Sequence, residues 1–259
     1  MTSIPQDTAH LSAGGRMPLL GFGTWQITGP QATDSVGWAL GAGYRHLDTA
    51  TVYGNETEVG VGLAESGVSR DEVFVTTKFP PERIGQEQDT LNASLDALGM
   101  EALDLWLIHA PRSEQENISI WEHLVAAREK GLTRDIGVSN YSLAEIDALT
   151  SATGVTPAVN QIRWSPLLFD RAVQDGHRER DVVLEGYSAL RGGTLEHPVI
   201  GEVAGRLDRT PAQVIVRWHL QHGVVVIPKS TQQERIVANA DVAGFELTDD
   251  DMAALDALS

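Results

Sequence analysis

Three ionisable side chains stand at the ends of apolar, strand-like runs in this sequence: Asp48, Lys78 and His109. Tyr53 follows Asp48 in the adjoining loop. If the runs are parallel strands, their carboxyl ends share one edge and the four side chains meet there. Each residue alone has an ordinary structural explanation, as a helix cap, a solvated charge or a satisfied core histidine. Their combination on consecutive runs favours a site that does chemistry.

The chemistry that suits this set is proton transfer to oxygen. Tyr53 is a poor acid near neutral pH because an unperturbed phenol has a pKa of ~10. A Lys78 ammonium at ~4 Å would lower that pKa, with at most ~4 kcal/mol at an effective dielectric of ~20, and burial would oppose it. Asp48 is placed to keep Lys78 charged, and His109 to orient a substrate oxygen. The set predicts protonation of an oxyanion that forms on a carbonyl carbon.

The elements that position these residues alternate between strand and helix. Strand-like runs begin at eight positions: Leu19, Tyr44, Val73, Leu103, Asp135, Ala158, Val182 and Val224. Stretches with helical spacing lie between them at 34–43, 57–67, 89–99, 120–131, 143–154 and 211–223. Eight strand and helix units predict an α/β fold, a single (β/α)₈ TIM barrel that occupies 1–259 as one domain.

Both ends of the chain carry local signals. Gly14 and Gly15 separate two short segments, which predicts a β-hairpin before the first barrel strand. Near the other end, Thr248 and Asp251 have the spacing of a capping box, so the acidic run there predicts a helix start rather than a metal site.

Composition narrows the function classes. The 259 residues contain 19 Lys and Arg against 36 Asp and Glu, a formal charge of −17 that disfavours nucleic acid and anionic membranes as partners. Without cysteine there is no disulfide, thiolate nucleophile or Cys-ligated metal, which suits the cytoplasm. No leader-like or membrane-length apolar run occurs, so we expect a soluble cytoplasmic protein.

Longer motifs resemble the aldo-keto reductases. They are GYRHLDTATVYGNETEVG (43–60), TTKF (76–79), LDLWLIHAP (103–111), GVSNY (137–141), NQIRWSP (160–166) and IPKSTQQERIVAN (227–239). The likeness runs from about Leu11 to Ser259 and is closest to bacterial members such as the 2,5-diketo-gluconate reductases. It implies a barrel whose N-terminal hairpin closes the bottom, and NADPH bound without a Rossmann fold. Consistently, the glycine pair Gly60 and Gly62 lies inside a predicted helix.

The resemblance also implies roles for individual residues. Tyr53 becomes the general acid, tuned by Lys78 and Asp48, while His109 orients the carbonyl of a small-molecule substrate. Trp25, Tyr53 and His109 are expected to touch that substrate. The expected contacts to the nicotinamide half are Gly23, Thr24, Trp25, Asp48, Ser139, Asn140, Gln161 and the stacking ring of Tyr187. The expected contacts to the phosphates and adenine are Ser188, Leu190, Lys229, Ser230, Arg235 and Asn239.

Some residues of the sequence indicate which cofactor is preferred, and others depart from the family pattern. Lys229 and Arg235 favour NADPH over NADH, since NADH lacks the 2′-phosphate. Arg191 stands where a small residue is usual, either as an extra phosphate contact or as a solvated charge. Ala238 removes one polar adenine contact, and Ala189 replaces a proline. Ala110, with short loops, predicts an open site and broad specificity for aldehydes, diketones and keto-sugars.

Other functions remain open at this point. One is a non-catalytic, NADPH-binding regulatory member of the same superfamily. Another is a Schiff-base lyase that uses Lys78 as its nucleophile, which would require Lys78 to lack a carboxylate partner. Family resemblance favours a monomer.

Overall fold

A closed barrel of eight parallel strands forms the centre of the protein. The computed structural model describes residues 4–259. The strands, in chain order, are β3 (Phe22–Gly23), β4 (His46–Asp48), β5 (Phe74–Phe79), β6 (Leu103–Ile108), β7 (Thr133–Ser139), β8 (Val159–Arg163), β9 (Val183–Tyr187) and β10 (Val225–Val226). Each pairs with its sequence neighbour, and a parallel bridge from Leu20 to Val226 joins the first strand to the last. The predicted TIM barrel is therefore confirmed.

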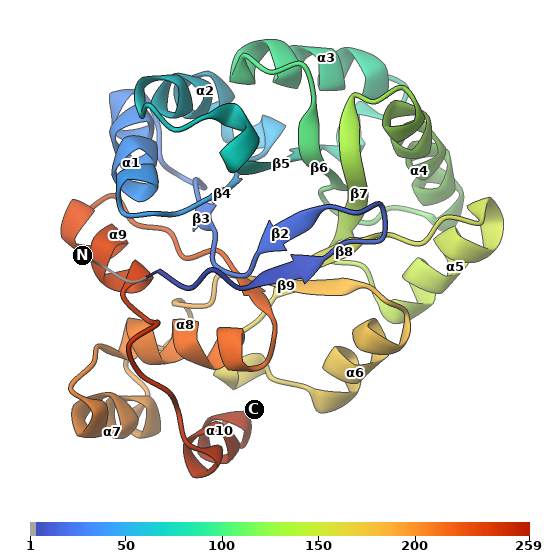
Figure 1. Cartoon of the computed structure of the whole chain (residues 1–259). Helices are drawn as coiled ribbons and strands as arrows, with labels where there is room; N and C mark the ends of the chain where they lie inside the picture. The colour runs from blue at the N-terminus through green and yellow to red at the C-terminus, as the bar shows by residue number, and fades with distance from the viewer. Residues whose placement is uncertain (1–3) are drawn as a thin grey trace.

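Ten α-helices surround the barrel in the described chain (Figure 1). They are α1 (Pro30–Gly41), α2 (Glu56–Glu65), α3 (Glu87–Leu98), α4 (Glu114–Glu129), α5 (Leu143–Thr153), α6 (Arg171–Glu179), α7 (Pro198–Leu207), α8 (Pro211–Gln221), α9 (Gln233–Ala240) and α10 (Asp249–Asp256). Short 3₁₀ turns are η1 (Thr51–Tyr53), η2 (Arg70–Glu72), η3 (Pro81–Arg83) and η4 (Pro166–Leu168). None of the described helices is long and apolar enough to cross a membrane.

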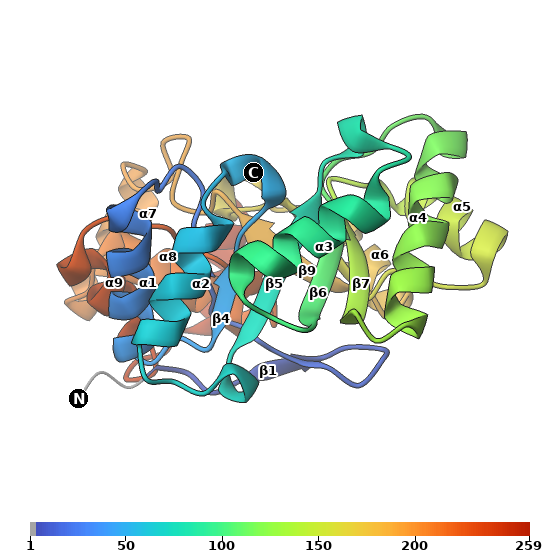
Figure 2. The same cartoon turned by 90° about the horizontal axis from the view of Figure 1, so that it is seen from above.

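The predicted hairpin covers the end of the barrel where the strands begin. It consists of β1 (Thr8–His10) and β2 (Arg16–Pro18), paired antiparallel with Ala9 opposite Met17. Near the start of β7, the Asp135 carboxylate accepts a hydrogen bond from the Ala13 amide at 3.2 Å and so ties the hairpin to the barrel. Figure 2 shows the hairpin along the lower edge of the molecule, below β4, β5 and β6. The opposite end, where the strands finish, stays accessible.

Glycines allow close packing between the first helices. A Cβ on Gly60 would lie 2.5 Å from the Leu98 carbonyl oxygen, and a Cβ on Gly62 would lie 2.8 Å from that of Thr33. These two glycines therefore serve the packing of α2 against α3 and α1, as predicted, rather than a phosphate-binding loop. Gly37, in the middle of α1, differs: a Cβ there would meet no heavy atom of a neighbouring element of the described chain within 4 Å.

The last helix is fixed at both ends. Thr248 and Asp251 form the predicted capping box at its start. Near its end, the Asp256 carboxylate accepts hydrogen bonds from Trp218 Nε1 at 2.8 Å and Arg171 at 2.9 Å, and its Oδ1 lies 2.7 Å from His222 Nε2. These contacts hold α10 against α8 and the start of α6.

Candidate active site

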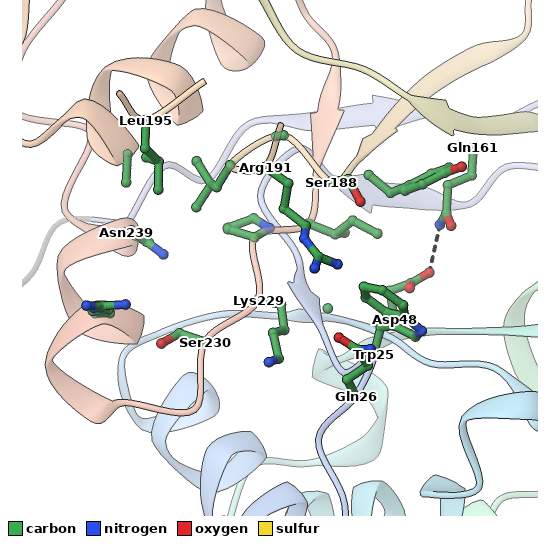
Figure 3. A pocket seen from close by; sticks show the side chains of 18 of the residues that line it. Trp25, Gln26, Asp48, Gln161, Ser188, Arg191, Leu195, Lys229, Ser230 and Asn239 are labelled. Atoms are coloured by element: carbon green, nitrogen blue, oxygen red, sulfur yellow. Dashed lines mark hydrogen bonds between the residues drawn. The ribbon is translucent and has the colours of Figure 1, made fainter. Parts of the chain in front are cut away.

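The side chains predicted to do chemistry meet at the carboxyl ends of the strands. A cleft of about 900 Å³ opens there, and Figure 3 shows the side chains that line it. Asp48 and Gln161 lie at one end of the cleft and Ser230 and Asn239 toward the other (Figure 3), and the lining also includes Tyr53, His109, Lys229 and Arg235. An open, elongated cleft with reactive groups at one end and cations at the other suits a long anionic ligand.

A buried ion pair lies at the base of the reactive end. Lys78 Nζ is 2.7 Å from each oxygen of the Asp48 carboxylate and also donates to the Thr49 carbonyl at 2.9 Å. Gln161 Nε2 donates to Asp48 Oδ2 at 2.8 Å (Figure 3). Burial is the largest effect on the pKa of Lys78 and would lower it, but the Asp48 carboxylate, Tyr53 and Glu185 together outweigh burial and the net direction is upward. Lys78 is therefore protonated, which argues against a Schiff-base nucleophile.

Tyr53 lies over this ion pair. Lys78 Nζ is 5.2 Å from the centroid of the Tyr53 ring. Burial raises the pKa of Tyr53 above its ordinary value, and the Lys78 charge lowers it by less. Burial, which was expected to oppose Lys78, is therefore the larger of the two effects in the protein alone, because it desolvates the phenolate. Lys78 still acts in the predicted direction.

A buried amide holds the turn that carries Tyr53. Asn55 Nδ2 donates to the backbone carbonyls of Thr24 at 2.9 Å and Ile27 at 2.8 Å, while its Oδ1 accepts from the Thr49 hydroxyl at 2.9 Å. Asn55 is fully buried, so all three bonds are shielded from water. The loop after β3 and the loop after β4 are thereby joined next to the cleft.

His109 faces Tyr53 from the end of β6. The two ring centroids are 5.8 Å apart in an edge-to-face arrangement. Burial and, to a smaller extent, the positive charge of Lys78 lower the pKa of His109 to about 4. The imidazole is therefore neutral at physiological pH, with one N–H that can donate to an oxygen in the cleft.

Polar groups from β7 to β9 form the adjoining wall. The Asn140 side chain donates to Ser139 Oγ at 3.0 Å and to the His109 carbonyl at 3.3 Å, and accepts from the Tyr187 hydroxyl at 2.9 Å. Asn140 has a φ of 63°, a left-handed conformation that asparagine tolerates better than most residues. The network fixes the orientation of the Tyr187 ring, the side chain predicted to stack on the nicotinamide.

The far part of the cleft is cationic in an otherwise acidic chain. Lys229, Arg235 and Arg191 line the cleft, and among residues 4–259 none of them forms an ion pair with a carboxylate. Burial and the neighbouring Arg191 charge lower the pKa of Lys229. The Arg191 guanidinium carbon lies 4.8 Å from the centroid of the Trp25 ring, across the cleft. Unpaired, converging cations are the arrangement that binds phosphate.

The structure brings together nearly all of the predicted site residues. The predicted residues that line the cleft are Gly23, Trp25, Asp48, Tyr53, His109, Ser139, Asn140, Gln161, Tyr187, Ser188, Leu190, Lys229, Ser230, Arg235 and Asn239. Thr24 and Lys78 do not line it. Thr24 is buried and donates its hydroxyl to the Asp48 carbonyl at 3.0 Å, and Lys78 is buried beneath Asp48. Both therefore support the site from below.

Several residues that line the cleft were not among those predicted from the sequence. They are Gln26, Val52, Leu195, Ile227, Pro228 and, at the start of α8, Thr210, Pro211 and Ala212. The Thr-Pro pair signalled the start of a helix but not its place beside the cleft. No group of three or more His, Asp or Glu side chains capable of holding a metal occurs within residues 4–259.

Comparison with known proteins agrees with this geometry. Residues 19–259 match the model of the aldo/keto reductase family. An aldo-keto reductase of Mycolicibacterium vanbaalenii is 46% identical over 255 residues, which cover 97% of this chain and 91% of the relative. The glyoxal reductase of Bacillus subtilis is 40% identical and covers 100% of this chain and 95% of its own. The chain therefore belongs to the aldo/keto reductase family.

Solved structures support the same assignment. An aldo/keto reductase from Brucella melitensis superposes with a TM-score of 0.94 at 37% identity, over 99% of this chain and 100% of the other. An aldo-keto reductase of Bombyx mori, solved in complex with NADP, has a TM-score of 0.91 at 30% identity over 99% of this chain and 94% of its own. The fold, and with it the class of NADP-dependent oxidoreductases, is shared along nearly the whole chain.

Proposed function

We propose that this protein reduces aldehydes and ketones to alcohols with NADPH, and that Tyr53 delivers the proton. One observation carries the proposal. The buried Asp48–Lys78 ion pair, at 2.7 Å, lies beneath Tyr53 at one end of a cleft whose other part is lined by unpaired cations of the described chain. The reactive end suits a carbonyl oxygen, and the cationic part suits the phosphates of a dinucleotide.

The charged and polar side chains that line the cleft suit NADPH. When bound, NADPH supplies the hydride that reduces the carbonyl carbon. Lys229, Ser230 and Arg235 would hold the 2′-phosphate, because two cations and a hydroxyl match a phosphate dianion. Asn239 would contact the adenine, and Tyr187 would stack on the nicotinamide. NADH would bind more weakly because it leaves the cations unpaired.

The reactive residues then divide the work on the carbonyl oxygen. Neutral His109 donates its N–H to that oxygen and so orients the carbonyl. Tyr53 transfers its phenolic proton to the same oxygen as the carbonyl carbon is reduced, which leaves an alcohol and a tyrosinate. Lys78 stabilises the tyrosinate by its charge, and Asp48 and Gln161 keep Lys78 in place. A proton from solvent restores Tyr53.

The substrate end of the cleft supports broad specificity. Trp25 and Val52 are 41% and 57% exposed, although both are large apolar side chains. Ala110 adds little bulk beside His109. An open apolar mouth with few polar contacts discriminates weakly among substrates. We therefore propose that small aldehydes, diketones and keto-sugars all react.

The test follows the loss of reduced nicotinamide with each class of carbonyl, with NADPH and NADH in parallel. The Tyr53→Phe variant should lose ~10²-fold or more of kcat while it binds NADPH as the wild type does. Turnover in Tyr53→Phe at the wild-type rate would refute the assignment of the acid. Saturable NADPH binding without turnover of any carbonyl would instead support a non-catalytic member of the family.

We also propose that the chain works as one barrel domain, as a monomer in the cytoplasm. The absence of cysteine supports a reducing compartment. Sedimentation of the purified protein at increasing concentration tests the monomer, since a dimer would double the mass.

A further inference from the structure

A second carboxyl group lies inside the barrel, one layer below the ion pair. Glu185 is on β9, where it pairs in register with Gln161 on β8, and its side chain is fully buried. Neither carboxyl oxygen has a hydrogen-bond partner among the described residues. Beside it, His46 Nε2 lies 3.7 Å from Oε1, beyond hydrogen-bond distance. The proposed mechanism gives this carboxyl no role.

The groups around Glu185 come from several strands of the barrel. From β4, His46 contacts it, and the charges of Asp48 on β4 and Lys78 on β5 both act on its pKa. On β8 its neighbour is the uncharged Gln161, whose amide points to Asp48, and on β10 its register partner is an apolar valine. The charge of Glu185 also raises the pKa of Tyr53, which lies above the ion pair.

The histidine beside Glu185 does not compensate its charge. His46 lies in the same interior layer, two residues before Asp48 on β4, with its Nε2 3.4 Å from the Thr76 hydroxyl. Its Nδ1 has no hydrogen-bond partner in residues 4–259, and a Cβ on Gly21 would lie 2.4 Å from that atom, so the ring is tightly enclosed. Burial lowers the pKa of His46 to about 4. The imidazole is therefore neutral at neutral and alkaline pH, so His46 cannot offset the negative charge of an ionised Glu185.

An ionised carboxylate in this place is costly because the described chain offers it no hydrogen-bond donor in exchange for its hydration. The pKa of Glu185 is raised to about 8: burial is the largest cause, the negative charge of Asp48 adds to it, and the Gln161 amide and the Lys78 charge oppose it by less. Glu185 is thus a neutral acid at neutral pH and becomes a carboxylate in mildly alkaline solution.

We propose that Glu185 is a positioning residue of the proton-transfer site, which acts on Tyr53 through the charge it adds beneath the Asp48–Lys78 pair. When Glu185 is a neutral acid, only Asp48 of these two carboxyl groups offsets the positive charge of Lys78, and the rest of that charge favours loss of the Tyr53 proton. As a carboxylate it offsets part of that charge, so Tyr53 holds its proton to higher pH. The inference rests on the proposed function for its catalytic meaning, but its test does not require turnover.

The experiment replaces all tyrosines with 3-fluorotyrosine, whose phenol is more acidic, and follows their ¹⁹F resonances against pH. The chain has four tyrosines, so the spectrum is simple, and Tyr53→Phe assigns the resonance of interest. In Glu185→Gln, which keeps the shape but cannot ionise, the Tyr53 midpoint should fall by about one pH unit, the order expected of one buried charge at an effective dielectric of ~20. Tyr141, which follows β7 and donates its hydroxyl to Asn117 on α4, is the internal control, and its resonance should not change in Glu185→Gln.

The same midpoint for Tyr53 in both proteins would overturn the proposal, and so would an equal change of the Tyr141 resonance, which would indicate a general structural change. The wild-type protein gives an independent check if Glu185→Gln does not fold. Its Tyr53 resonance should show an added inflection near pH 8 as Glu185 ionises. A smooth single titration there would overturn the proposal. If Tyr53→Phe proves fully active, the proposed function fails while this titration still reports on Glu185.

Discussion

Reversal of one charge in the cleft tests how the protein chooses its cofactor. Arg235 lies on α9, exposed at the cationic part of the cleft and free of any carboxylate within the described chain. A hydrogen bond between charged groups contributes about 1.5–3 kcal/mol, which corresponds to ~10- to 150-fold in affinity. Arg235→Glu also brings a negative charge near the 2′-phosphate, so we expect NADPH binding to weaken by at least ~10²-fold. NADH affinity should change by less than about threefold, as NADH carries no phosphate there.

The assay titrates each cofactor against the intrinsic tryptophan fluorescence, to which Trp25 in the cleft contributes. Arg178→Glu is the matched control, because it makes the same change of charge on α6 at a side chain that is 65% exposed and does not line the cleft. The control removes the general effect of net charge on anion binding. An unchanged ratio of NADPH to NADH affinity in Arg235→Glu would refute the phosphate assignment. Equal losses in both variants would show that only the overall field matters.

Other substitutions test the packing and the protonation states. Gly60→Ala should lower the free energy of unfolding by ~1–3 kcal/mol, because the new Cβ meets a backbone oxygen. Gly37→Ala, where the new Cβ has open space, should raise the free energy of unfolding by ~0.5–1 kcal/mol. Urea unfolding measures both variants, and similar changes in the two would contradict the packing argument. Asp256→Ala should cost ~1–3 kcal/mol, as it leaves the buried indole N–H of Trp218 without an acceptor, and a wild-type urea midpoint would contradict this. His109, with a pKa of about 4, is neutral above pH 5 and gains a proton only as the pH falls through 4. The kcat of reduction should therefore show no inflection between pH 5.5 and 7.5, and one that disappears in a His109→Gln variant would refute its neutrality.

Much of the barrel was predictable because its physics is local. Apolar runs of β-branched residues and stretches with helical spacing alternate in order, and all eight runs became strands. Helices α6, α7 and α9 were not among the predicted stretches. The sequence of α6, RAVQDGHRE, is very polar, and its buried positions are Gln174, Gly176 and His177, so it shows no run of apolar residues at helical spacing. Packing against the barrel therefore stabilises α6, whose own sequence does not specify a helix strongly.

The site was predictable to the extent that it follows strand ends. Asp48, Lys78 and His109 stand where their apolar runs stop, so their convergence follows from a parallel sheet. Glu185 gave no such signal, since it lies within an apolar run and its neighbour His46 precedes the strand end. The contact between Arg191 and Trp25 joins two loops whose paths no spacing rule specifies. Polar groups inside a barrel and contacts between loops become visible only in three dimensions.

The buried amide of Asn55 has a consequence for how new specificities can arise in this protein. It locks the backbone on both sides of the substrate mouth, whereas the neighbouring Val52 side chain projects outward with 57% of its surface exposed. Evolution, or a laboratory library, can therefore vary Val52 widely without disturbing the frame that aims Tyr53. Variation at Asn55 itself would misalign both loops at once. Selection for a new carbonyl substrate should accumulate its changes at positions like Val52 and leave Asn55 untouched.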